Sequence, residues 1–387
     1  LRVENLAGVQ TAAGEAQLAE GSAEPPAAVA LTTDGLPGEV TLADRQSVTL
    51  PLTLTAPEAE GTAALRVSAT LPDGRTVTKD LTIPVARSDA PVTRRIELTL
   101  APGGAQTVDL APLGAFRPGT GRMTLTSGAY AQLDVPGAVA RLVTYPYGCT
   151  EQIASGALPQ LYAAGLMPEG VPRPPSVEPK AVDDAIAQVL TRQTAEGDFG
   201  LWRAEGGDRW LTAYVTDFLG RARAAGHAVP EASFKAALRA LQNGLNAAAD
   251  PQNADPDENA ATAYAAYVLA REGQAVVSDL RYYADTGGEG FATPLAAAQM
   301  GAALAAVGDQ PRADRMFRQA QALADAGREP EALFRADYGT ILRDRAGVLA
   351  LAAEAGSQAV DRAALSAGIA EGADKAALST QEAGWLV

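Results

Sequence analysis

Within about the first 135 residues of the chain, several short runs alternate apolar and polar residues with a period of two. Residues 65–71 and 76–83 show this alternation, and Pro72, Asp73 and Gly74 between them predict a hairpin turn. Further runs of the same kind lie at 48–54, 96–100 and 122–126. Short strands separated by turn residues are typical of a β-sandwich. The segment around Pro91 is a candidate linker between two such units.

After about residue 135 the apolar positions recur with the helical period near 3.6. Val182, Ile186 and Val189, for example, lie on one face of a helix. Further stretches with helical character are 211–219, 260–270, 295–307, 341–353 and the residues from 376 onward. Gly, Pro and Asp separate them. Helical segments that recur in this way predict an array of helical hairpins.

The composition and charge exclude several classes of protein. The net charge of −15 argues against a protein that binds the phosphate backbone of nucleic acids, and Lys and Arg form no blocks. No run of about 18 apolar residues is present, so no membrane-spanning segment is predicted. One Cys and one His exclude a disulfide within the chain and leave no Cys/His metal site, and we expect no cofactor. His227, before Val229 and Pro230, is expected to be an exposed loop residue.

The chain begins with Leu1 rather than Met and stops at Val387 within an apolar, helix-like pattern. Neither end carries capping or turn residues. We therefore expect this sequence to be a piece of a longer protein, with any targeting segment elsewhere.

The single cysteine, Cys149, lies where the strand pattern gives way to the helical one, in the string YPYGCTEQ that ends at Gln152. A helix is predicted to begin after Gly148, with Glu151 in its first turn. Cys149 and Gln152 are three residues apart, so their side chains meet on one face, and a helix N-terminus favours the reactive thiolate. Attack on the Gln152 carboxamide would expel ammonia and leave an internal thioester. Gly148, without a Cβ, would leave room for that ring. The spacing alone fits a buried structural cysteine more readily.

The eight-residue string resembles the thioester motif of the α2-macroglobulin and complement family, specifically of its bacterial branch. Residues 199–202 and 208–219 are similar to the second and third helices of that family's thioester domain, and 379–386 to a later one. The resemblance covers about residues 135–387.

The resemblance implies a multidomain β plus α architecture. Residues 1–90 would form part of a macroglobulin-like β-sandwich. Residues 91–134 would form the first half of a CUB domain, into which the thioester domain is inserted. Residues 135–387 would form that thioester domain, an α/α toroid that is truncated at its C-terminal end.

The function implied by the resemblance is broad-range inhibition of proteases, as part of bacterial defence. Family members trap a protease covalently when one of its lysines attacks the thioester. Because the bond is consumed in one event, the protein would not be an enzyme. Bacterial members are periplasmic, usually held at the inner membrane by a lipid. The implied partners are target proteases, with a cell-wall synthase as a second candidate and no nucleic acid.

The resemblance also assigns roles to the residues of the motif. Cys149 supplies the sulfur and Gln152 the acyl group, while Glu151 is a spacer and local hydrogen-bonding partner. Tyr145 matches a position that shields the thioester in bacterial relatives, although simple core packing explains this residue equally well. Tyr147 is assigned to packing.

A second region, 258–264, matches the part of the family that chooses between amine and hydroxyl acceptors. Thr262 and Tyr264 are the candidates there, although such residues more often belong to a core. A His in this region serves as a general base for hydroxyl attack in some complement proteins. None is present here, which favours transfer to amines.

Two other interpretations stay open. An α/α toroid also houses carbohydrate-active enzymes, which need paired carboxylates near the ring centre. The acidic candidates are Asp183, Asp184, Asp255, Asp257 and Glu258, and helix starts or solvated loops explain them more readily. The third interpretation is a non-covalent interaction scaffold in which the thioester does not form.

Overall fold

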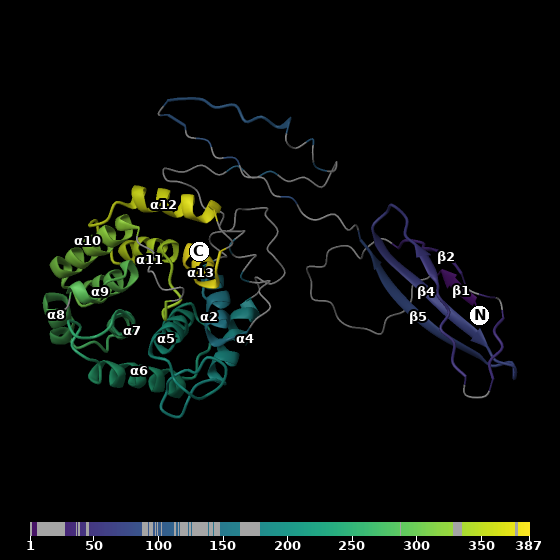
Figure 1. Cartoon of the computed structure of the whole chain (residues 1–387), viewed down its shortest axis with the longest axis horizontal. Helices are drawn as coiled ribbons and strands as arrows, with labels where there is room; N and C mark the ends of the chain where they lie inside the picture. Colours follow the sequence, from purple (N-terminus) through teal and green to yellow (C-terminus); the bar gives the residue numbers. More distant parts are fainter. Residues whose placement is uncertain are drawn as a thin grey trace. The chain divides into compact units, whose positions relative to one another are not determined.

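The computed structural model of the chain describes residues 2–5, 28–86 without 36, 38, 44 and 45, scattered positions between 92 and 142, and 148–162, 179–286, 288–327, 335–375 and 378–387. The chain divides into two compact units, Leu1–Gly121 and Arg122–Val387. Strands form the described structure of the first unit, and helices form that of the second (Figure 1).

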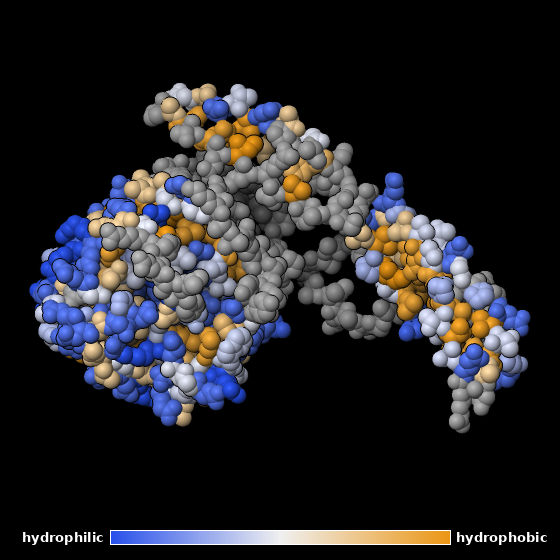
Figure 2. All heavy atoms as spheres, in the orientation of Figure 1, coloured by the Kyte–Doolittle hydropathy of each residue, from blue (hydrophilic) through white to orange (hydrophobic). Residues whose placement is uncertain are grey.

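The first unit contains two small antiparallel sheets. Their strands are β1 (Arg2–Asn5), β2 (Thr32–Asp34), β3 (Thr53–Thr55), β4 (Gly61–Thr70) and β5 (Thr76–Val85). One sheet has the order β1-β4-β5, and β2 pairs with β3 in the other. Val29, Leu31, Ala63 and Leu65 form a small buried core. Figure 2 shows hydrophobic residues along this unit, and Val77 and Leu81 of β5 are among those exposed.

The predicted hairpin is confirmed as β4 and β5. Gly74 has a φ of 84°, a conformation that glycine adopts without steric cost, and this lets the chain reverse in a tight turn. Thr70 then lies opposite Thr76, and Arg66 bonds to Asp80 across the strands at 2.7 Å. Such cross-strand pairs fix the register that the alternation predicts.

The other strand predictions have mixed outcomes. Within 48–54, only the last two residues are extended in a strand, β3. In the runs at 96–100 and 122–126 the structure describes only residues 96, 98, 100, 123 and 125, and none of these five lies in a strand. The β-sandwich and the half CUB domain therefore stay predictions.

The second unit is built from helices that alternate between an inner and an outer layer (Figure 1). The inner helices are α2 (Thr150–Ala157), α5 (Arg209–Ala224), α7 (Pro256–Arg271), α9 (Pro294–Ala306), α11 (Ile341–Glu354) and α13 (Thr380–Leu386). The outer helices are α4 (Pro179–Leu190), α6 (Glu231–Asn246), α8 (Val277–Thr286), α10 (Gln310–Ala326) and α12 (Arg362–Lys375). Each inner helix contacts the next, and α13 contacts α2, so the ring closes.

The inner and outer helices differ in how many of their residues are buried. Every residue of α7 from Asn259 to Ala270 is buried, as is every residue of α9 from Pro294 to Leu304. A helix that is buried all round belongs to the centre of a domain. In α10, by contrast, the buried residues are spaced three or four apart along one face: Ala313, Met316, Phe317, Ala320 and Ala324. Amphipathic outer helices thus cover an apolar inner ring, which confirms the predicted α/α toroid.

The helical stretches predicted from the sequence lie on α4, α5, α7, α9, α11 and α13. The outer helices α6, α8, α10 and α12 were not among the predicted stretches. Alanine and glycine allow the inner helices to pack closely. A Cβ added at Gly301 of α9 would lie 3.1 Å from the Phe317 ring and 3.2 Å from the Ala313 carbonyl oxygen of α10.

A buried charge cluster ties α5, α7 and α11 together. Asp217 of α5 is 1% exposed and bonds to Arg221 at 2.8 Å and to Arg271 of α7. The Tyr264 hydroxyl donates to its other carboxylate oxygen at 2.8 Å. Arg221 also pairs with Glu354 of α11 at 2.7 Å. The buried charges therefore have partners, which burial requires.

Candidate functional site

The candidate site forms where α2 begins. Cys149 is the N-cap residue of this helix, with an extended backbone (φ −68°, ψ 163°). The Thr150 N–H donates to the Leu201 carbonyl at 2.9 Å, and its hydroxyl donates to the Gly200 carbonyl at 2.6 Å. The Arg192 guanidinium donates to the Gly148 carbonyl at 2.6 Å. These bonds anchor the residues on both sides of Cys149.

The structure brings Cys149 and Gln152 together. The backbone N–H of Cys149 donates to Oε1 of the Gln152 side chain at 3.1 Å. This bond folds the carboxamide back over the helix start, in the manner of the glutamine in a capping box. The spacing of three residues therefore places the carboxamide beside the backbone of the residue that carries the sulfur.

Cys149 is buried, with 5% of its surface exposed. Burial raises the pKa of its thiol, and the nearby charge of Glu151 raises it further, while hydrogen bonds from the Gln152 and Glu151 backbone lower it to a smaller extent. The net shift is upward. The expectation that the helix N-terminus would favour the thiolate is therefore wrong, because desolvation outweighs the helix dipole. The raised pKa favours the thiol over the thiolate at neutral pH wherever the Cys149 side chain is free.

Glu151 lies at the centre of a buried hydrogen-bond network and is 3% exposed. Its Oε1 accepts from the Ser155 hydroxyl at 2.6 Å and from Gln381 Nε2 at 2.9 Å. The Thr380 hydroxyl donates to Oε1 at 3.0 Å and lies 3.2 Å from Oε2. The Cys149 thiol donates to Oε2, with Sγ 4.0 Å away. The carboxylate thus joins the first turn of α2 to the first turn of α13.

Aromatic residues that the sequence analysis did not assign to the site surround this network. The Tyr214 hydroxyl lies 2.8 Å from Ser155 Oγ, which itself donates to Glu151. Trp210 stacks on Tyr214 at 5.2 Å and contacts the Tyr338 ring at 5.4 Å between ring centroids. Burial, with the charges of Asp208, Cys149 and Glu151, raises the pKa of Tyr338 to about 12.

Tyr338 also has an unusual backbone, with a φ of 53° that L-residues rarely adopt. A buried ion-pair cluster holds the segment around it. Arg335 bonds to Asp337 at 2.6 Å and to Asp344 at 2.9 Å, and Arg343 bonds to Asp337 at 2.7 Å. No local sequence signal marks Tyr338, because its position depends on these contacts.

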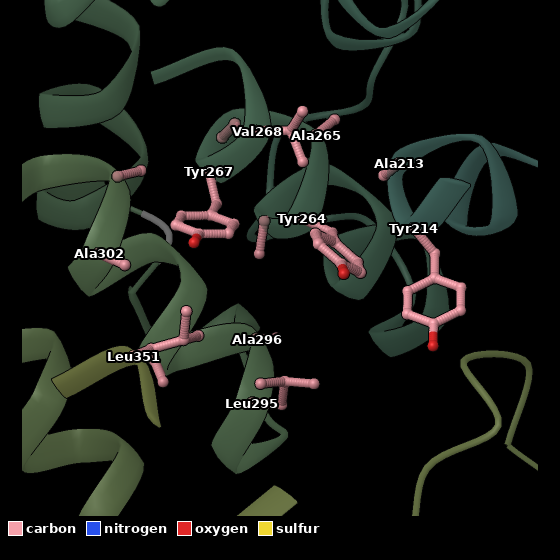
Figure 3. Close-up of a cluster of buried hydrophobic side chains, with 14 of the residues drawn as sticks. Ala213, Tyr214, Tyr264, Ala265, Tyr267, Val268, Leu295, Ala296, Ala302 and Leu351 are labelled. Atoms are coloured by element: carbon pink, nitrogen blue, oxygen red, sulfur yellow. The ribbon is translucent and has the colours of Figure 1, made fainter. Parts of the chain in front are cut away.

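The remaining predicted residues have different outcomes. Thr262 and Tyr264 are both buried in α7, and the Tyr264 hydroxyl donates to Asp217 rather than to a residue of the motif (Figure 3 shows Tyr264 between Tyr214 and Tyr267). Tyr145 and Tyr147 lie outside the described residues, so their roles stay predictions. A Cβ at Gly148 would meet no atom within 4 Å, so the space around Cys149 does not depend on a glycine at this position.

Three of the acidic candidates for an enzyme lie at the start of α7, whereas Asp183 and Asp184 lie within α4, beyond its first turn. Asp255 is the N-cap of α7 and accepts from the Glu258 N–H at 2.7 Å, and Asp257 lies in the same first turn. Asp183 bonds to the His227 ring at 2.8 Å. His227 is half-buried rather than exposed, because this bond holds its ring against α4.

A cavity of about 270 Å³ lies between α5, α6 and α7, and its carboxylates are Glu196 and Asp198. None of the acidic candidates from the sequence lines it. In the described part of the chain, no three His, Cys, Asp or Glu side chains gather into a metal-binding group. Among the same residues, no helix has the length and apolarity needed to cross a membrane.

Comparisons with known proteins agree with this geometry. Residues 123–246 match the family model described as the A-macroglobulin TED domain. The chain is 36% identical to an α2-macroglobulin of Escherichia coli over 231 residues, which is 57% of the chain and 14% of that protein. It is 29% identical to an α2-macroglobulin of Xylella fastidiosa over 260 residues, 62% of the chain and 16% of that protein.

Solved structures of bacterial α2-macroglobulins are also similar to this chain. A Salmonella α2-macroglobulin reacted with methylamine has a TM-score of 0.65 and 29% identity, over 92% of this chain and 24% of that one. Native E. coli α2-macroglobulin from domain MG7 to the C-terminus has a TM-score of 0.65 and 27% identity, over 92% of this chain and 59% of that one. Over residues 123–246 the chain is therefore similar to the TED domain of the macroglobulin class. Within that class it resembles the bacterial α2-macroglobulins in both sequence and fold, which confirms the predicted resemblance. It spans about a sixth or less of the length of the curated relatives.

Proposed function

We propose that this chain is the thioester-bearing part of a bacterial α2-macroglobulin-like protease trap, in which Cys149 and Gln152 are joined by an internal thioester. The observation that carries the proposal is the bond from the Cys149 N–H to the Gln152 carboxamide oxygen, at a cysteine that is itself buried. Burial protects a thioester because it keeps water and amines from the acyl carbon.

The relatives support amines and proteases as the reacting partners. One Salmonella structure is of the protein reacted with methylamine. Two E. coli structures, with TM-scores of 0.55 and 0.54, are of the protein activated by trypsin and by porcine elastase. For this chain we propose that a lysine of a bound protease attacks the Gln152 acyl carbon. A new amide bond forms, the Cys149 sulfur leaves as a thiol, and the trap is consumed in one event.

A labelled primary amine tests this proposal. The chain is incubated with biotinylated cadaverine, and the labelled residue is located by peptide mass spectrometry. Label is expected on Gln152 and is expected to disappear in Cys149→Ser, which removes the sulfur but keeps the size of the side chain. Gln358→Asn changes an exposed glutamine and is the matched control, because it should leave labelling unchanged. Equal labelling of Gln152 in Cys149→Ser would contradict the proposal.

The remaining parts of the proposal follow from the resemblance. We propose amines rather than hydroxyls as acceptors, because the described surroundings of Cys149 contain no histidine that could act as a general base. We also propose a periplasmic location, with the full-length protein held at the inner membrane by a lipid. The cell-wall synthase stays a prediction that neither the described residues nor the relatives support.

A further inference from the structure

We propose that Glu151 is the catalytic base with which the chain forms its own thioester, and that the Cys149 backbone N–H stabilises the oxyanion of that reaction. This inference rests on the thioester proposed above and adds the groups that make it. The thiol that must be deprotonated donates to Glu151 Oε2, with Sγ 4.0 Å away. The carbonyl oxygen that must accept negative charge, Gln152 Oε1, lies 3.1 Å from the Cys149 nitrogen.

The network around Glu151 orients the carboxylate for this role. Ser155 and Gln381 donate to Oε1 at 2.6 Å and 2.9 Å, and Thr380 bridges both oxygens. Oε2 therefore faces the sulfur. Because Glu151 and Cys149 are only 3% and 5% exposed, bulk water has little access as an alternative base. A base positioned within hydrogen-bond reach of the proton it removes is the geometric requirement for general base catalysis.

The reaction that follows is balanced within these three residues. Glu151 takes the proton from the Cys149 thiol, and the sulfur attacks the Gln152 Cδ. Negative charge develops on Oε1, where the Cys149 N–H donates to it. The carbonyl then re-forms and the bond from Cδ to Nε2 breaks. Nε2 leaves with its two hydrogens and the proton from Glu151, as ammonia. The carboxylate is restored, and a thiol and an amide have become a thioester.

A base is needed here because burial keeps the Cys149 sulfur protonated at neutral pH. The other nearby polar groups are less suitable. Burial and the charge of Glu151 hold the pKa of the Tyr214 hydroxyl well above its usual value, so it stays a donor. Arg192 is a cation that donates to Thr150 and Gly148. Glu151 is the acceptor that the sulfur reaches.

The test follows the loss of ammonia in the newly made chain. The full chain is synthesised in a cell-free system, translation is stopped, and intact mass is recorded over time. Wild type is expected to lose one ammonia. Glu151→Gln, which keeps the size and most hydrogen bonds of the side chain, is expected to lose it at least about 100-fold more slowly. Glu258→Gln is the matched control, because Glu258 is also a first-turn acid of an inner helix and should leave the rate unchanged.

Chemical rescue separates a base from a merely structural carboxylate. Glu151→Ala should be as slow as Glu151→Gln, and added formate should accelerate it, whereas chloride at equal ionic strength should not. Cooperative melting, followed by circular dichroism, shows which variants are folded. If Glu151→Gln does not melt cooperatively, Glu151→Asp decides: a folded but slower variant supports the proposal, and an unchanged rate contradicts it.

The outcomes distinguish this inference from the proposed function. If wild type never loses ammonia, the thioester itself is wrong. If wild type loses ammonia and Glu151→Gln does so within about twofold of its rate, Glu151 is not the base. If Glu151→Gln is slow and formate fails to accelerate Glu151→Ala, Glu151 only positions the sulfur, and the proposal is overturned.

Discussion

At the scale of single residues, the state of the Cys149 sulfur decides the chemistry of the site. Burial raises the pKa of the thiol above its usual value near 9.0, so less thiolate is present at neutral pH and direct alkylation is slow. We predict slow alkylation of Cys149 in the variant Gln152→Met, which removes the acyl group and leaves a free sulfur. Its rate of alkylation by iodoacetamide should be at least about tenfold below that of a free cysteine near pH 7 and should still rise above about pH 9. A rate that levels off below about pH 8 would contradict the buried thiol.

Asp217 is a buried charged residue in the inner layer of the ring. Burial alone raises the pKa of Asp217, but Arg221 and Arg271 outweigh it, and the net shift is downward. A lowered pKa contributes stability that is present above the ordinary value near 3.8 and is lost as the pH falls through the folded value. We predict that Asp217→Asn loses about 1–3 kcal/mol at neutral pH, because Arg221 and Arg271 each lose one of their carboxylate partners.

Urea unfolding at neutral and at acidic pH measures this effect. The difference between Asp217→Asn and wild type should shrink in acid, where the wild-type carboxyl takes up its proton. Glu231→Gln is the matched control, since Glu231 pairs with Arg223 in an exposed position next to the same helix. Its unfolding should be nearly unchanged. Equal losses in the free energy of unfolding for the two substitutions would mean that the buried cluster stabilises the fold no more than the exposed ion pair does.

The sequence identified only part of the site at this scale. Cys149, Gln152 and Glu151 could be named because their relation is local, within one helical turn. Gln381 and Thr380 could not, because they reach Glu151 from 230 and 229 residues away. Tyr338 was missed for the same reason. The expected thiolate was wrong because a sequence shows the helix N-terminus but not the burial that outweighs it.

At the scale of elements, close packing between α9 and α10 depends on a glycine. A Cβ at Gly301 would lie 3.1 Å from the Phe317 ring and 3.2 Å from the Ala313 carbonyl, and a backbone carbonyl cannot move aside easily. The overpacking costs about 1–3 kcal/mol. It exceeds the gain of up to about 1 kcal/mol that alanine brings to a helix. We therefore predict that Gly301→Ala lowers the free energy of unfolding.

Gly244→Ala on α6 is the control for this prediction. Its added Cβ would come no closer than 3.6 Å to a neighbouring atom, the Arg209 Nε. With no clash, only the helix preference remains, so Gly244→Ala should raise the free energy of unfolding. Thermal or urea unfolding of both variants checks the opposite signs. Stabilisation by both substitutions would show that α9 and α10 have room to separate.

The elements themselves were predictable where one pattern dominates. The β4–β5 hairpin follows from its alternation and from Gly74, and the inner helices follow from their apolar content. The outer helices α6, α8, α10 and α12 were not predicted, although the buried residues of α10 are spaced three or four apart along one face. That spacing is itself a helical signal in the sequence.

At the scale of the whole molecule, the site is completed only when the ring of helices closes. The first turn of α13 supplies Thr380 and Gln381 to the carboxylate on α2, and the two helices are in contact. Contacts between residues so distant in sequence form after local helices. The base that we propose is therefore oriented late, once the second unit has its native arrangement, and the thioester forms in a folded domain rather than in the nascent chain.

The central claim is that Cys149 and Gln152 are joined in the folded chain, and intact mass with a thiol titration tests it most directly. The native chain should be lighter than its sequence by one ammonia and should show no titratable thiol. Methylamine should then add its own mass and release one thiol, because it opens the thioester at the Gln152 acyl carbon. A cooperatively folded chain with the full sequence mass and one titratable thiol, unchanged by methylamine, would contradict the account.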